Sequence, residues 1–139
     1  MPRPRASGGA PIPADQRSGC ILLIDDEEVI LDVMYTLLHD DEGYAVVRAR
    51  SGREALAARI PEPPALILID ASLRGEDPRA IVEALRQRPG WEAAALVVCS
   101  GVPDIYEITR ALRANASLPK PFELEELLAL VRHYVQPLL

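Results

Sequence analysis

The feature that most constrains the fold is an apolar run, Ala65–Ile69, that continues without interruption until it ends at the carboxylate of Asp70. A strand that is apolar at every position is typical of a parallel sheet with both faces covered by helices. Asp70 would then follow the carboxyl end of that strand, where open α/β sheets place their functional groups. The alternative is an aspartate that only caps the following loop.

The rest of the chain alternates predicted strands and helices. Shorter apolar runs predict strands at residues 20–24, 44–47, 94–99 and 116–118. Apolar residues at helical spacing predict helices over residues 29–39 and 123–135, and three more that begin after Ser51, at Asp77–Pro78 and at Pro103–Asp104. Strict alternation of five strands and five helices predicts an α/β fold with a parallel sheet and helices on both faces.

Length and charge set the organisation of the chain. Its 139 residues suit one domain. Residues 1–19 contain little large apolar surface and carry a charge of +2, so we expect a disordered tail before a folded domain over residues 20–139. The net charge of −6 makes nucleic acid a poor partner. Without a membrane-length apolar stretch or a signal sequence, we expect no membrane association and a cytoplasmic location.

Four of the five predicted strands end in residues whose side chains can bind a ligand or react: Asp25–Asp26, Asp70, Ser100 and Lys120. In a parallel sheet these ends share one edge, where clustered carboxylates repel one another unless a cation joins them. Oxygen ligands without histidine or cysteine suit Mg²⁺ or Mn²⁺. A hydroxyl and an ammonium beside them suit a phosphoryl group. Lys120 is the only lysine against fourteen arginines, which indicates that a compact point charge is required there.

The segments ILLIDDEE, LILID, VVCSG and LPKPF, in this order and spacing, resemble the receiver domain of bacterial two-component response regulators over residues 20–136. The resemblance implies a flavodoxin-like three-layer sandwich with a five-stranded parallel sheet of order 2-1-3-4-5. It also implies that Asp70 is the phosphoacceptor and that Ser100 and Lys120 contact the phosphoryl group.

The same resemblance implies a metal site for Mg²⁺ or Mn²⁺, made by Asp25, Asp26, Asp70 and the main-chain carbonyl of Ser72. A cis bond before Pro121 is a further expectation.

The function implied is phosphorelay signalling. The donor would be a sensor histidine kinase or a phosphotransfer protein, and the chain would be a phosphoacceptor with at most slow self-catalysed phosphorylation and dephosphorylation, not an enzyme. Phosphorylation would draw Ser100 inward and change a target-binding face formed by the fourth helix, fifth strand and fifth helix. Apolar residues of these helices are consistent with a homodimer, and equally with core packing.

Three positions depart from the family pattern. Ser117 replaces the aromatic residue expected three positions before the lysine, Arg74 replaces a proline, and Pro78 replaces a glycine. Ser117 and Arg74 favour an alternative, a receiver-like scaffold that works without phosphorylation. Val102 is apolar and cannot hold an attacking water, so we predict a long-lived phosphoryl group. A phosphatase of the haloacid dehalogenase type would need an aspartate where Ser72 stands.

Overall fold

The computed structural model describes residues 12–13 and 16–137, and most of the predicted tail, residues 1–19, lies outside them. Its elements follow in the order β1 (Ile21–Ile24), α1 (Glu28–Tyr35), η2 (Thr36–Asp41), β2 (Val46–Ala49), α2 (Gly52–Ala57), β3 (Leu66–Asp70), α3 (Pro78–Arg86), η3 (Trp91–Ala93), β4 (Ala95–Ser100), α4 (Ile105–Ala111), β5 (Ala116–Pro119) and α5 (Leu124–Tyr134). All neighbouring strands pair in parallel in the order β2-β1-β3-β4-β5, so the predicted fold class and strand order are confirmed.

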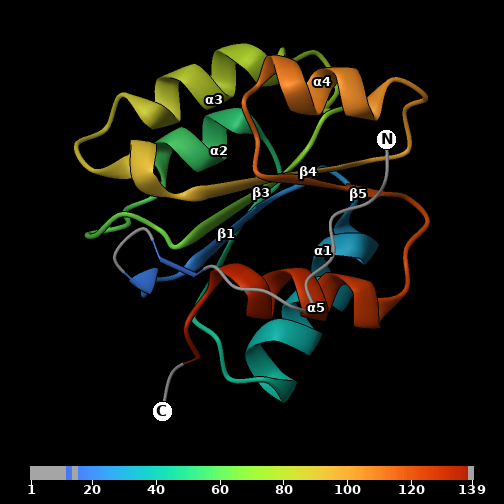
Figure 1. Cartoon of the computed structure of the whole chain (residues 1–139). Helices are drawn as coiled ribbons and strands as arrows, with labels where there is room; N and C mark the ends of the chain where they lie inside the picture. The colour runs from blue at the N-terminus through green and yellow to red at the C-terminus, as the bar shows by residue number, and fades with distance from the viewer. Residues whose placement is uncertain (1–11, 14–15, 138–139) are drawn as a thin grey trace.

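The sheet is the middle layer of three (Figure 1). Helices α1 and α5 cover one face, and α2, α3 and α4 cover the other. Strands β1, β3 and β4 are buried at every position, which explains their continuous apolar sequences. Alternate side chains of each strand enter two separate cores, with Leu23 and Leu68 on the α1–α5 side and Ile24 and Ile69 on the other.

The predicted helix starts have the expected caps. The Ser51 hydroxyl accepts a hydrogen bond from the amide of Glu54 at 3.0 Å, where α2 begins. The Asp77 carboxylate accepts from the amide of Arg79 at 3.0 Å, and Pro78 occupies the first position of α3. These local patterns position the loops that carry the strand-end residues.

Two predictions made from apolar spacing were wrong in detail. The strand expected at 44–47 runs from Val46 to Ala49, because Tyr44 instead packs in the core between α1 and α5 and donates its amide to Leu38 at 2.8 Å. The helix expected over 29–39 ends as α1 at Tyr35 and continues as a π-helix, η2.

Only some of the apolar residues at helical spacing in α1 and η2 are buried. Leu31, Met34 and Leu38 are buried, whereas Val29 and Val33 are 74% and 42% exposed. At the start of α5, the apolar side chain of Leu124 is 44% exposed.

Apolar residues that were compatible with a homodimer, including Ile105, Leu127 and Val131, are buried inside these cores. Among the described residues, every helix is too short or too polar to cross a membrane.

Candidate functional site

Three carboxylates meet at the carboxyl edge of the sheet. Asp25 follows β1 and Asp70 ends β3, and these strands are neighbours with Ile24 opposite Ile69. Asp25, Asp26 and Asp70 each place a carboxylate oxygen within 4.8 Å of the others. Asp25 and Asp70 are almost fully buried, so their negative charges need compensation from partners inside the protein.

Lys120 provides that compensation from the far side of β4. Its Nζ lies 2.8 Å from Asp25 Oδ2, 3.1 Å from Asp70 Oδ2 and 3.0 Å from Glu27 Oε1, and its side chain is 14% exposed. Burial alone would lower the pKa of Lys120, but the hydrogen bonds to Asp25 and Glu27 and the surrounding negative charge outweigh it and raise that pKa. The ammonium is therefore a permanent cation at the centre of the cluster.

Asp70 is held in its ionised form. Burial raises its pKa, but the amide and hydroxyl of Ser72, both 2.8 Å from Asp70 Oδ1, and the charge of Lys120 lower it below its usual value. For Asp25 the balance is reversed, because burial and the charge of Asp70 raise its pKa more than Lys120 and the amide of Glu27 lower it. The group that the family resemblance assigns as phosphoacceptor is thus the more acidic of the two buried carboxyls.

Asp26 is oriented by the loop after β3. Its Oδ2 accepts a hydrogen bond from the main-chain amide of Arg74 at 3.1 Å. The Arg74 side chain itself is 93% exposed, and its Nε is 3.8 Å from the same oxygen, so it adds little. The proline expected at this position in the family has no N–H to donate. The departure noted in the sequence therefore creates a main-chain contact to Asp26.

Ser100 lies at the end of β4 and is fully buried. Its neighbour Cys99 is paired with Asp70, so Ser100 extends one residue beyond Asp70 on the adjacent strand. Its hydroxyl accepts from the amide of Val102 at 3.3 Å, and its carbonyl accepts from the amide of Lys120 at 3.0 Å. The structure thus joins Ser100 to Lys120 through the main chain.

The residues singled out from the sequence therefore gather at one edge, with Ser72 contacting Asp70 through its amide and hydroxyl. Sequence reasoning missed the role of Glu27, because it assigned this residue no part in the site. Glu27 is the residue before α1, and its exposed carboxylate reaches Lys120. Its position directly after two strand-end aspartates was the available signal.

The donor set fits a hard divalent cation. Three carboxylates and no thiol or imidazole are the ligands that Mg²⁺ and Mn²⁺ prefer. The Lys120–Pro121 bond is cis, as the resemblance implied, and places the lysine at the start of the turn into α5.

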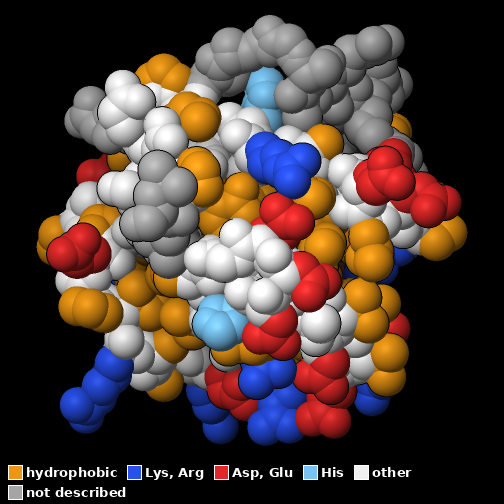
Figure 2. Space-filling view, turned by 90° about the horizontal axis from the view of Figure 1, so that it is seen from below, with side chains coloured by type: hydrophobic (Ala, Val, Ile, Leu, Met, Phe, Trp, Pro, Cys, Tyr) orange, Lys and Arg blue, Asp and Glu red, His pale blue; other side chains and the backbone are white. Residues whose placement is uncertain are grey.

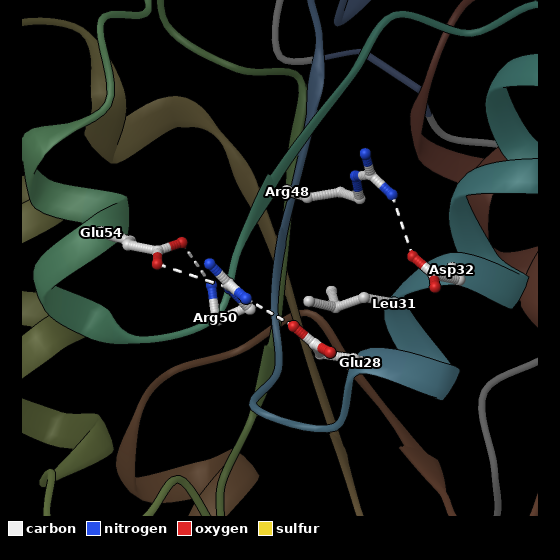
Figure 3. A pocket seen from close by; sticks show the side chains of 6 residues that line it. All are labelled: Glu28, Leu31, Asp32, Arg48, Arg50 and Glu54. Atoms are coloured by element: carbon white, nitrogen blue, oxygen red, sulfur yellow. Dashed lines mark hydrogen bonds and ion pairs between the residues drawn. The ribbon is translucent and has the colours of Figure 1, made fainter.

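A separate hollow of about 350 Å³ lies between α1, β2 and α2 (Figure 3). Its charged side chains already bind one another: Arg48 pairs with Asp32 at 3.0 Å, and Arg50 pairs with both Glu28 and Glu54. Because these charges are matched within the hollow, it is a weaker candidate for a ligand site than the carboxylate cluster.

Comparison with known proteins gives a consistent result. The family model for the response regulator receiver domain matches residues 21–132. Transcriptional regulatory protein KdpE of Mycobacterium tuberculosis (strain H37Rv) is 34% identical over 118 residues, which are 84% of this chain and 50% of KdpE. The uncharacterized transcriptional regulatory protein YkoG of Bacillus subtilis is 34% identical over 116 residues, 82% of this chain and 50% of YkoG. The chain thus spans about half the length of the curated relatives it matches.

Solved structures agree in fold. The chemotaxis protein CheY4 of Vibrio cholerae has a TM-score of 0.71 at 27% identity, covering 83% of this chain and 97% of that one. The response regulator protein TrrA of Thermotoga maritima, solved in complex with Mg²⁺ and BeF, has a TM-score of 0.69 at 23% identity and covers 82% of this chain and 96% of its own, a likeness of fold alone.

Proposed function

This chain belongs to the family of response regulator receiver domains, and we propose that it is a cytoplasmic switch that accepts a phosphoryl group on Asp70. The observation that carries the proposal is the state of Asp70 itself: a buried, ionised carboxylate paired with Lys120 and adjacent to Asp25 and Asp26. Because this carboxylate is buried, few other reactants reach it, and its negative charge makes it a nucleophile.

The donor would be the phosphohistidine of a sensor histidine kinase or phosphotransfer protein. An oxygen of Asp70 attacks the phosphorus, the P–N bond breaks, and the imidazole keeps the bonding electrons and takes up a proton. Lys120 is placed to exchange its contact with Asp70 for one with a phosphoryl oxygen, and Ser100 to donate its hydroxyl. The chain contributes positioning and charge, so it acts as a phosphoacceptor and not as an enzyme with turnover.

Asp25, Asp26, Asp70 and the carbonyl of Ser72 would hold Mg²⁺ or Mn²⁺. When bound, the cation supplies positive charge to the phosphoryl oxygens and offsets the repulsion between them and the carboxylates. The contact of Arg74 with Asp26 would keep that carboxylate turned toward the cluster before the cation arrives.

The donor protein needs a surface beside Asp70, and the structure offers an apolar one. A groove of about 380 Å³ between α1 and the start of α5 has Glu27 and Lys120 at its edge, together with Ile30, Val33, Met34, Pro121, Phe122 and Leu124. Val29, Val33 and Leu124 are the large apolar side chains most exposed among the described residues. They belong to the α1–α5 layer, and Figure 2, which views the molecule from that side, shows exposed apolar side chains among charged ones. Because this groove adjoins the site, we assign it to the donor.

The downstream target protein would bind the face formed by α4, β5 and α5. The coupling to it must differ from the family pattern, because Ser117 is fully buried and its hydroxyl has no hydrogen-bond partner among the described residues. Because position 117 has no aromatic ring, no ring can turn inward there when Ser100 moves. This observation also favours the second candidate, a scaffold whose binding does not depend on phosphorylation.

Intact-protein mass spectrometry after treatment with acetyl phosphate and Mg²⁺ tests the proposal. The wild-type chain should gain the mass of one phosphoryl group, Asp70→Asn should gain none, and Asp104→Asn should behave as the wild type. Asp104 is a matched control because it is an exposed aspartate that also follows a strand. A wild-type chain that gains no mass would support the scaffold instead.

A further inference from the structure

Helices α3 and α4 lie on the face of the sheet opposite α1 and α5 (Figure 1). Several arginines line a groove between these two helices. It has a volume of about 290 Å³ and is lined by Arg79, Arg86 and Arg113, with Val82 and Leu112 among its apolar residues. Glu83 is the one carboxylate on its lining. The groove is therefore basic, although the chain as a whole carries a net charge of −6.

These three guanidinium groups lack carboxylate partners. Elsewhere, arginines such as Arg48 and Arg132 pair with an acid at 3.0 and 3.1 Å. Within the part of the chain that the structure describes, no ion pair joins Arg79, Arg86 or Arg113 to any carboxylate, Glu83 included. The positive charges that line this groove are therefore not neutralised by an ion pair with its one carboxylate.

Two of these cations are held close together. Arg86 Nη1 donates to the carbonyl of Leu112 at 2.5 Å, and its Nη2 donates to the carbonyl of Arg113 at 3.1 Å. Burial, and then the positive charge of Arg113, lower the pKa of Arg86. The carbonyls just after α4 hold the guanidinium of Arg86 within reach of the charge of Arg113, and a bound anion would relieve the repulsion between the two cations.

The backbone at Arg113 points to a role for its side chain. The amide of Arg113 donates to Arg110 at 3.0 Å and that of Ala114 donates to Thr109 at 2.9 Å, the Schellman pattern that ends helices with a left-handed residue. That residue is usually glycine, yet here it is Arg113 with φ of 54°. A residue with a side chain is strained in this conformation, so it carries an energetic cost that glycine would avoid. Such a cost at an exposed arginine suggests that its charge is used.

We propose that the α3–α4 groove binds an extended acidic segment of a partner protein. Arg79 and Arg86 are seven residues apart on α3, which is about 10 Å along a helix. An extended segment covers about 3.3 Å per residue, so negative charges three residues apart would match the two ends of the groove. A single phosphate is too short to reach both ends, and three arginines are few for a nucleic-acid backbone, whose binding depends on many phosphate contacts. This inference does not depend on phosphorylation of Asp70.

The test is fluorescence anisotropy with the full chain and two labelled peptides of the same composition. The first peptide has one glutamate separated by two alanines from a pair of glutamates, and the second has the three glutamates side by side. We expect the first peptide to bind more tightly, with an affinity that falls as salt rises. The double variant Arg79→Ala, Arg113→Gly should weaken its binding about tenfold, since each exposed charge pair contributes modestly.

Arg113→Gly also keeps the test independent of folding. Glycine relieves the left-handed conformation, so this variant should unfold at a temperature equal to or above that of the wild type while binding the peptide more weakly. The matched control is Arg53→Ala with Arg59→Ala, which removes two exposed arginines away from the groove and should leave binding unchanged.

Three results would overturn the proposal: no binding of the first peptide at millimolar concentration, equal affinity for both peptides, or unchanged affinity in the double variant. Competition experiments give a further test, with each competitor at the same concentration of negative charge as the peptide. If pyrophosphate displaces the peptide, the groove is a small-anion site, and if single-stranded oligothymidine displaces it, the groove is a nucleic-acid site. Either result would overturn the proposal.

Discussion

Replacing Lys120 by methionine should destabilise the metal-free protein at neutral pH far more than any other single loss of positive charge in the site. The methionine fills a similar volume without an ammonium. It leaves two almost fully buried carboxylates, Asp25 and Asp70, next to each other without their shared cation. Removing one partner of a buried ion pair is costly because the remaining charge stays desolvated.

The magnitude follows from the distances. At an effective dielectric constant of about 20, the contacts of Nζ at 2.8 Å and 3.1 Å with the two aspartates are each worth about 5–6 kcal/mol in Coulomb energy. Desolvation of the buried lysine, whose side chain is 14% exposed, offsets several kcal/mol of this. We expect a net loss of about 3 kcal/mol in the free energy of unfolding at pH 7.

The dependence on pH has a definite sign. In the wild type the pKa of Lys120 is raised, so its contribution to stability is fully present below the ordinary lysine value and is lost only at strongly alkaline pH. In the variant, both aspartates lose the cation that favours their charged forms, so their folded-state pKa values rise. A carboxyl with a raised pKa takes up a proton in the folded state as pH falls, and it then destabilises that state less. The difference in the free energy of unfolding between the wild type and the variant should therefore shrink from about pH 7 to pH 4.5.

Urea unfolding followed by circular dichroism, at several pH values and with or without Mg²⁺, measures the effect. Mg²⁺ should recover part of the loss, since it supplies charge to the same carboxylates. Arg74→Met is the matched control, because its guanidinium is 93% exposed and should cost less than about 0.5 kcal/mol. If Lys120→Met is as stable as the wild type from pH 5 to pH 8, then the electrostatic account of the site is wrong.

Four further outcomes are expected. Asp26→Asn should reduce the rise in unfolding temperature that Mg²⁺ causes in the wild type, and an unchanged rise would remove Asp26 from the metal site. Ser51→Ala should lower the free energy of unfolding by about 1 kcal/mol by removing the cap of α2, measured in urea. Burial raises the pKa of Cys99 to about 12, so at pH 8 its thiol should resist iodoacetamide in the folded chain and react on unfolding, as peptide mapping would show. With apolar Val102 beside Ser100, the acyl phosphate should persist, and a half-life of seconds would contradict this.

The central strands were predictable because their environment leaves a signature in the sequence. A strand covered on both faces must be apolar at each position, as β3 is from Leu66 to Ile69, and helix starts use local hydrogen bonds such as that of Ser51. The edge strand β2 was misplaced by two residues because one side of it meets solvent, so Arg48 interrupts its apolar pattern. For α1, adjacent apolar residues permitted two buried stripes, and only packing on the sheet selected Leu31 over Val33.

The sequence by itself determined which strand ends carry acids, a hydroxyl and an amine, because burial periodicity and strand alternation are local properties of the chain. Only the tertiary structure decided that Lys120 pairs with Glu27 as well as Asp25, that the amide of Arg74 orients Asp26, and that the carboxylate of Glu76 accepts from the amide of Gly52 at 2.7 Å where α2 begins. These partners are far apart along the chain, so their distances depend on how loops pack at the sheet edge, and no spacing in the sequence encodes that packing.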